Sequence, residues 1–271
     1  MILLNNPSLS HYAQTRLAAY QAKVDAGADF DACVKLAKET FPSANVKGNK
    51  TFDEIKEELN GMCCGPERCN YCEDSKADEV EHIKPKDWYP GLCFVWENYC
   101  YSCGTCNGPK NNKFAIILDD GALFKLEIDK DAPKRTVPPA GVSALLSPRT
   151  ENPMQFLFLD IISATFFFTP LNDDVNHNDY KRADYTVSVL GLNSRSYLVK
   201  SRRQAYTGYR ARLSEYVTKR QAGAPQAELD ELIKNLKEDH HQTVWQEMKR
   251  QQGQIPELTA LFSAAPEALT W

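Results

Sequence analysis

The cysteines of this chain are concentrated in one short stretch. Eight of the nine lie between Cys63 and Cys106, and the remaining one is Cys33. Such a cluster is typical of a local metal site, whereas a disulfide framework is typical of small secreted chains. The N-terminal residues MILLNNPSLS lack the basic segment of a secretory signal, so we expect a cytoplasmic protein with reduced cysteines.

Two Cys-x2-Cys pairs, separated by 30 residues, lie within this stretch. Both sulfurs of such a pair can reach one ion, and two pairs complete a tetrahedral shell with zinc–sulfur distances of about 2.3 Å. A four-thiolate shell leaves no open position, so the ion would stabilise structure and would not activate water. The sequence therefore predicts a structural Zn²⁺ site formed by Cys69, Cys72, Cys103 and Cys106.

The other five cysteines have different interpretations. Cys100 extends the second pair to Cys-x2-Cys-x2-Cys, which leaves an iron–sulfur cluster open as an alternative, with Cys63 and Cys64 as spare thiols. Cys93 lies in an apolar stretch and Cys33 on the apolar side of a predicted helix, so both are expected in the core. A thioredoxin-like redox role is disfavoured because neither pair lies at a recognisable strand-to-helix junction.

The first 60 residues are predicted to be helical. Apolar spacing predicts one helix that stops near Gly27 and a second that ends before Pro42. Thr51 and Glu54 match a capping box, which predicts a third helix that opens at Thr51 and buries Phe52, Ile55 and Leu59.

The rest of the chain divides by composition. Residues 61–118 are rich in Gly, Pro, Asn and Cys, which indicates a small domain that depends on metal for stability. Asp119-Asp120-Gly121 predicts a hairpin between strands at 114–118 and 123–128, and further strands are predicted at 155–162 and 165–169. The last third is predicted to be helical, with a break at Gly223 and Pro225. We expect an α+β fold with a helical segment at 1–60, the metal-stabilised domain at 61–118, and strands followed by helices at 119–271.

The charge is distributed unevenly. The net charge is −4, which by itself argues against a nucleic-acid-binding protein. Residues 181–220 nevertheless carry ten Lys or Arg against two acidic residues, while residues 51–100 carry five basic against twelve acidic residues. The Arg-rich helix at 195–220, with Tyr206 and Tyr209, is either a DNA surface or a packed helix whose arginines are solvated or bound to a partner. No apolar run approaches the roughly 20 residues that span a bilayer, so no membrane association is expected.

Acidic, imidazole and amide side chains lie between and beside the cysteine pairs. Glu81 and His82 are adjacent on a short predicted strand that ends at Pro85, and Asn98 and Asn107 follow. Carboxylate and amide oxygens suit Mg²⁺ or Mn²⁺, and an imidazole is a suitable base near neutral pH. Adjacent strand residues point to opposite faces, so Glu81 and His82 share a site only if the strand bends. Together these residues predict metal-assisted phosphodiester hydrolysis.

The order of these residues resembles a known family, the zinc-stapled HNH endonucleases with a ββα-metal fold. The motifs that carry the resemblance are Cys69-x2-Cys72, Glu81-His82-Ile83-x-Pro85, Trp96-x-Asn98 and Cys103-x2-Cys106-Asn107-x2-Lys110. The resemblance implies a DNA endonuclease in which His82 is the general base and Glu81 and Asn107 bind the catalytic Mg²⁺ or Mn²⁺. It also implies that Asn98 orients His82 or braces the loop, and that Lys110 and Lys113 contact backbone phosphate.

The flanks are similar to the HNH subunit of Septu-type anti-phage defence systems, including those linked to retrons. The resemblance rests on Trp96-x-Asn98, the Leu190-Gly191-Leu192-Asn193 turn and the Arg-rich helix that follows. It implies an ATPase partner in a hetero-oligomeric complex and degradation of nucleic acid during infection, with phage DNA, host DNA and RNA all open as targets. The alternative class is a zinc-stabilised nucleic-acid-binding or adaptor module that keeps the HNH shape without catalysis.

Overall fold

The computed structural model describes residues 1–127 and 135–271, and its helices and short antiparallel sheets confirm the α+β class. The N-terminal segment forms α1 (His11–Asp25), α2 (Phe30–Ala44) and α3 (Lys50–Gly61). Each helix begins after a capping side chain, because the oxygens of Ser10, Asp29 and Asn49 accept hydrogen bonds from backbone N–H groups of the first turn.

The predicted end of the second helix is wrong, since α2 continues through Pro42 to Ala44. The proline lies in the last turn, where the loss of one backbone donor disturbs little of the helix, and Phe41 and Ala44 beside it are buried. Cys33 is half-buried and packs against the N-terminal core, as predicted.

The predicted start of the third helix is also wrong, because Asn49 caps α3 and the capping box does not form. Glu54 instead accepts hydrogen bonds from the backbone N–H and the hydroxyl of Ser10, over 2.6 and 2.8 Å, and so ties α3 to the start of α1. The predicted apolar face is confirmed, since Phe52, Ile55 and Leu59 are fully buried.

A ββα unit follows the N-terminal helices. β1 (Glu79–His82) pairs antiparallel with β2 (Tyr99–Ser102), with Glu81 opposite Cys100 and His82 opposite Tyr99. Two 3-10 turns, η1 (Pro90–Leu92) and η2 (Trp96–Asn98), lie in the connection between the strands, and α4 (Gly104–Lys110) follows β2 directly.

The predicted hairpin is present as β3 (Phe114–Ile117) and β4 (Leu123–Leu126), with β5 (Val142–Ser143) on the other edge of β3. Gly121 occupies the turn with φ +80°, a conformation that favours glycine. Residue 128, the predicted end of the second strand, lies outside the described residues.

The two later strands are shorter than predicted. They are β6 (Leu157–Leu159) and β7 (Phe168–Pro170), and the 3-10 turn η3 (Pro153–Gln155) precedes them. Asp160 ends β6 because its side chain accepts hydrogen bonds from the backbone N–H groups of Ile162 and Ser163, over 3.1 and 2.9 Å.

The C-terminal part is helical, as predicted. It contains α5 (Asn178–Val189), α6 (Ser196–Gln221), α7 (Gln226–Lys237), α8 (Gln242–Gln251) and α9 (Pro256–Ala264), with 3-10 turns η4 (Gln252–Gln254) and η5 (Pro266–Thr270). The predicted break at Gly223 and Pro225 separates α6 from α7.

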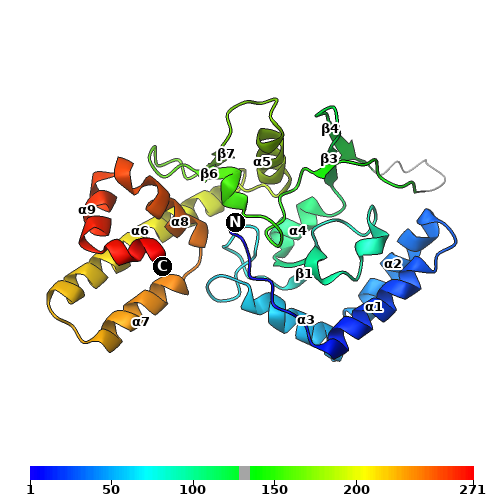
Figure 1. The fold of residues 1–271 in the computed structure, drawn as a ribbon, viewed down its shortest axis with the longest axis horizontal. Helices are drawn as coiled ribbons and strands as arrows, with labels where there is room; N and C mark the ends of the chain where they lie inside the picture. Colours follow the sequence, from blue (N-terminus) through cyan, green and yellow to red (C-terminus); the bar gives the residue numbers. More distant parts are fainter. Residues whose placement is uncertain (128–134) are drawn as a thin grey trace.

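The ββα unit lies between the N-terminal helices and the C-terminal helices (Figure 1). It contributes to both apolar clusters identified among the described residues. Val80, Phe94 and Tyr99 pack with α1–α3, while Cys69, Cys72, Cys103 and Cys106 join the larger cluster of the C-terminal part. Within residues 1–127 and 135–271, none of the helices has the length and apolar character needed to cross a membrane.

Candidate nuclease and metal site

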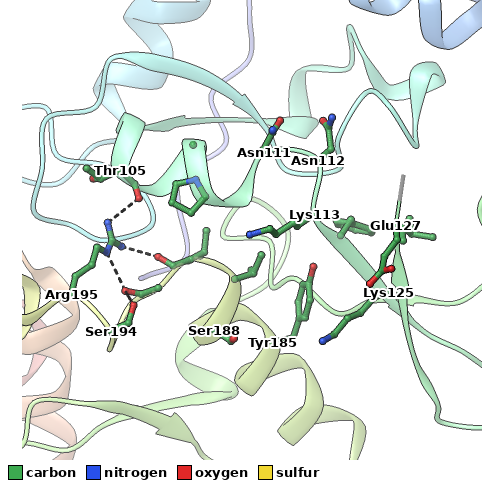
Figure 2. A pocket seen from close by; sticks show the side chains of 17 residues that line it. Thr105, Asn111, Asn112, Lys113, Lys125, Glu127, Tyr185, Ser188, Ser194 and Arg195 are labelled. Carbon is green, nitrogen blue, oxygen red and sulfur yellow. Dashed lines mark hydrogen bonds between the residues drawn. The ribbon is translucent and has the colours of Figure 1, made fainter. Parts of the chain in front are cut away.

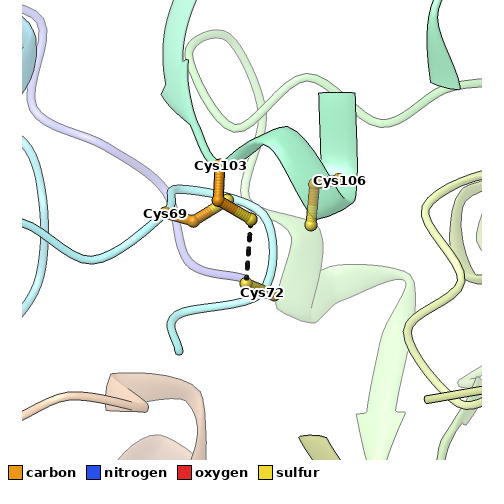
Figure 3. Close-up of side chains that lie close together, drawn as sticks. All are labelled: Cys69, Cys72, Cys103 and Cys106. Carbon is orange, nitrogen blue, oxygen red and sulfur yellow. Dashed lines mark hydrogen bonds between the residues drawn. The ribbon is translucent and has the colours of Figure 1, made fainter. Parts of the chain in front are cut away.

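The four predicted metal-binding cysteines lie together. The sulfurs of Cys69, Cys72, Cys103 and Cys106 are buried and all within 4.8 Å of one another (Figure 3). Four sulfurs around one tetrahedral zinc ion would lie about 3.8 Å apart, and Cys72 Sγ lies 3.8 Å from Cys103 Sγ. The donor set therefore fits one zinc ion held between the loop after α3 and the start of α4.

Polar groups of other residues contact the cysteine sulfurs. Arg195 Nη2 donates a hydrogen bond to Cys106 Sγ over 3.3 Å, and the hydroxyl of Thr105 lies 3.0 Å from Cys103 Sγ. Zinc with four thiolates would carry a net charge of −2, so a guanidinium beside it stabilises the occupied site. Arg195 lies in the turn between α5 and α6, and the motif spacing gave no signal that it would reach the metal site.

The remaining cysteines do not join the cluster. Cys93 and Cys100 are fully buried, and burial raises the pKa of each thiol to about 12. Burial likewise raises the pKa of Cys63 to about 12. Among the described residues, the sulfurs that lie within 4.8 Å of one another come from Cys69, Cys72, Cys103 and Cys106, so this arrangement favours a single four-thiolate ion over a larger cluster that recruits Cys100.

The predicted general base, His82, lies at the end of β1 and is only 5% exposed. Its ring contacts Phe41 of α2, with centroids 4.4 Å apart, and Tyr99 of β2, with centroids 5.2 Å apart. Its Nε2 lies 2.9 Å from the carbonyl oxygen of Cys93. Because a carbonyl oxygen only accepts, Nε2 must carry the proton, and Nδ1 is then the bare nitrogen of the neutral ring.

Burial keeps this imidazole neutral. It lowers the pKa of His82 to about 3, and the positive charge of Lys86 acts in the same direction. The ring is therefore neutral at physiological pH, and Nδ1 is its one nitrogen with a free lone pair.

Glu81, the predicted metal ligand, points to the other face of β1 and meets the buried side chain of Lys110. The ammonium of Lys110 donates to Glu81 Oε1 and, over 2.9 Å, to the carbonyl oxygen of His82. Burial raises the pKa of Glu81, and the charge of Lys110 opposes this rise. Lys110 is therefore an internal cation that joins α4 to β1, and its predicted contact with backbone phosphate stays a prediction.

Asn107 lies on the same face of the unit as Glu81, one turn of α4 before Lys110. Its Nδ2 donates a 2.7 Å hydrogen bond to Glu79 Oε2. The amide oxygen, Oδ1, is then the atom that could bind a metal ion. Glu79 Oε1 would lie 3.3 Å from a Cβ built on Gly104, so the missing side chain of Gly104 permits this close approach. The sequence motif did not single out Glu79, although the strand period of two places it beside Glu81.

Asn98 closes the loop between the two strands. Its Oδ1 accepts from Lys84 N over 2.8 Å, and its Nδ2 donates to the carbonyl oxygens of Lys84 and Leu92, both over 3.0 Å. Two roles are predicted for Asn98, and these contacts fit the one in which it braces the loop. The same loop carries the Cys93 carbonyl, which contacts His82.

Lys113, the second predicted phosphate contact, is exposed and lies apart from this buried cluster. It lines a cavity of about 840 Å³ between α4, β4 and α5. The cavity is thus on the side of α4 that carries Thr105, Gly108 and Pro109.

The Arg-rich helix corresponds to α6, and its arginines are largely used within the chain. Arg202 is buried and donates to the carbonyl oxygens of Phe166 and Leu192, over 3.0 and 2.7 Å. Three other arginines form ion pairs: Arg210 with Glu257, Arg212 with Asp239 and Arg220 with Glu267. Tyr209 is buried, with its hydroxyl 2.8 Å from the carbonyl oxygen of His240. These contacts favour the packed-helix interpretation over a DNA surface.

The described residues thus form a ββα unit with four buried cysteine sulfurs placed so that they could hold one metal ion. A 78-residue stretch of the chain is 40% identical to the Septu protein PtuB of Bacillus thuringiensis, and it covers 28% of this chain and 30% of that protein. The match thus spans less than a third of the relative's length. No protein-family profile and no solved structure matches the chain.

Proposed function

We propose that this chain is a metal-dependent HNH endonuclease that hydrolyses phosphodiester bonds of DNA. One observation carries the proposal: Glu81 and His82 end the first strand of a ββα unit, Asn107 faces that strand from the helix, and four cysteines form a metal site beside them. The shared face of Glu81 and Asn107 supports the metal-binding role that the HNH resemblance assigns to this pair, while His82 lies on the opposite face of the strand.

His82 would remove a proton from water through Nδ1, because Nε2 is held by the Cys93 carbonyl. The water would attack phosphorus in line with the departing 3′ oxygen, which would take a proton from solvent water, and the products would be a 5′ phosphate and a 3′ hydroxyl. Glu81 and Asn107 would hold Mg²⁺ or Mn²⁺, which supplies charge neutralisation at the phosphate when bound. Because the ammonium of Lys110 contacts Glu81 Oε1, a divalent ion at this carboxylate would bind its second oxygen or displace the ammonium.

The local similarity to a Septu protein supports a defence role. We propose that the chain acts in the cytoplasm as the nuclease effector of a Septu-type or retron-linked anti-phage complex with an ATPase partner. The internal use of the α6 arginines supports this assignment, because the chain would then obtain part of its DNA-binding surface from a partner.

The alternative is a zinc-stabilised binding or adaptor module without catalysis. The observation that favours it is the contact between Glu81 and Lys110, which places an internal cation where a catalytic ion is expected. Both functions use the same fold, so only a measurement of cleavage separates them.

The test is cleavage of supercoiled plasmid, single-stranded DNA and single-stranded RNA, with the co-encoded ATPase present or absent. We expect cleavage that requires Mg²⁺ or Mn²⁺, stops with EDTA, and yields products that DNA ligase can rejoin. Saturable DNA binding without cleavage in any arm, under conditions where the zinc content stays at one ion per chain, would establish the adaptor instead.

A further inference from the structure

The cavity between α4, β4 and α5 lies outside the cysteine and HNH motifs. Its volume of about 840 Å³ is within the range of small-molecule sites. Figure 2 shows Lys113 entering from the segment after α4, Lys125 from β4 and Tyr185 from α5. Arg195 closes the end nearest the metal site, where its Nη1 donates to the carbonyl oxygen of Thr105 over 3.2 Å.

The cavity wall is positively charged. Lys113, Lys125 and Arg195 contribute three cations, and Glu127 is the one carboxylate among the described lining residues. Within residues 1–127 and 135–271, neither Lys113 nor Lys125 forms a salt bridge. Two ammonium groups without carboxylate partners on one wall favour an anionic ligand.

Tyr185 provides a second, independent observation. Its side chain is only 8% exposed, and its hydroxyl points toward the cavity interior (Figure 2). None of the described residues forms a hydrogen bond with that hydroxyl, and its oxygen is not sealed from solvent, so a ligand in the cavity can reach it. Burial raises the pKa of Tyr185, so the hydroxyl stays protonated and can donate to an anionic oxygen.

The remaining wall is mixed. Phe114, Leu126 and Val189 contribute apolar surface, and Asn111, Asn112 and Ser188 contribute uncharged polar groups. A ligand that uses the whole wall therefore combines an anionic group with a part that has both apolar surface and hydrogen-bonding edges, which is the combination that a nucleotide offers.

We propose that this cavity binds a nucleotide, with its phosphate on Lys113, Lys125 and the Tyr185 hydroxyl and its base against the mixed wall. The nucleotide is either part of a nucleic-acid strand or a free nucleoside monophosphate. For a strand, the inference extends the proposed nuclease function, because α4 has Asn107 and Lys110 on one side and the cavity on the other. The test below measures binding separately from cleavage. Nucleotide binding in the cavity and the proposed nuclease activity can therefore fail independently.

The test uses fluorescence titration of a labelled twelve-nucleotide oligothymidylate and calorimetric titration of dTMP, both without added Mg²⁺ or Mn²⁺ so that no cleavage occurs and the structural zinc ion is retained. The variants are Lys113→Ala/Lys125→Ala and Tyr185→Phe. The matched control is Lys47→Ala/Lys200→Ala, which removes the same charge from exposed positions elsewhere. Melting temperatures establish that each variant is folded.

We expect the Lys113→Ala/Lys125→Ala variant to weaken binding about tenfold or more, and Tyr185→Phe about threefold to tenfold, as expected for lost charge-assisted hydrogen bonds. The control pair should stay within about twofold of the parent. Binding of dTMP identifies a free-nucleotide site, and binding of the oligonucleotide alone identifies a strand site. The proposal is overturned if the parent binds neither probe, or if the control pair weakens binding as much as the cavity pair.

Discussion

The amide nitrogen of Asn107 donates a 2.7 Å hydrogen bond to a carboxylate oxygen of Glu79, so the amide oxygen is the atom left for a metal ion. This oxygen belongs to the α4 residue that faces the same side of β1 as Glu81. A second carboxylate that orients a predicted metal ligand is a common feature of protein metal sites.

We therefore expect Glu79→Ala to lower the affinity for catalytic Mg²⁺ about 10- to 100-fold, the usual effect of removing a group that orients a ligand. Glu79→Gln should retain most of the affinity, because its amide oxygen can accept the same hydrogen bond. Calorimetric titration with Mg²⁺ and the Mg²⁺ dependence of cleavage both measure this. Equal Mg²⁺ affinity in Glu79→Ala and parent would remove the positioning role.

The Lys110–Glu81 pair is buried, so loss of one partner should be costly. Lys110→Met leaves the Glu81 carboxylate without its cation and should lower the free energy of unfolding by about 3–5 kcal/mol. Lys113→Met, three residues later on an exposed position, should change it by less than about 0.5 kcal/mol. Chemical denaturation of the two variants provides the comparison, and equal midpoints would contradict a stabilising role for Lys110.

The zinc site is predicted to be needed for the fold of the ββα unit. Purified protein should contain about one zinc ion per chain, and Cys72→Ser should lose zinc and the cooperative unfolding of this unit. Cys63→Ser is the matched control, because its thiol lies outside the four-cysteine cluster. Elemental analysis and thermal melting measure both effects, and a zinc-loaded Cys72→Ser protein would refute the assignment of this ligand.

The buried, neutral state of His82 predicts a pH dependence of stability. Its pKa is lowered to about 3 in the folded protein and is near 6.5 in the unfolded chain, so the unfolded state binds more protons between these values. Stability from this group is therefore present above pH 6.5 and is lost as the pH falls toward 3. Between pH 6.5 and 4.5 the parent should lose about 2–3 kcal/mol more than His82→Gln, which lacks the titrating ring. Parallel pH profiles of unfolding free energy for the two proteins would contradict this protonation state.

The metal site was predictable from the sequence because two Cys-x2-Cys pairs impose their own geometry. The four sulfurs of Cys69, Cys72, Cys103 and Cys106 come together whatever the flanking fold is. The buried face of α3 was predictable for a similar reason, since the helical period alone places Phe52, Ile55 and Leu59 on one side.

Contacts between distant segments were not predictable from local patterns. The charge count over residues 181–220 could not reveal that Arg202 is buried against Phe166 and Leu192, or that Arg195 reaches a zinc ligand. Tertiary packing likewise placed the ring of Phe41 on His82 and moved the helix cap from Thr51 to Asn49. Each of these contacts depends on how the three parts of the chain pack, which spacing within one segment does not encode.

Single-turnover cleavage of DNA at saturating Mg²⁺ tests most directly whether His82 is the general base of a nuclease. His82→Ala should cleave about 100- to 10,000-fold more slowly than the parent, with zinc content unchanged. His11→Ala, an exposed histidine at the start of α1, should cleave at the parental rate. A His82→Ala protein that cleaves DNA as fast as the parent would contradict the account.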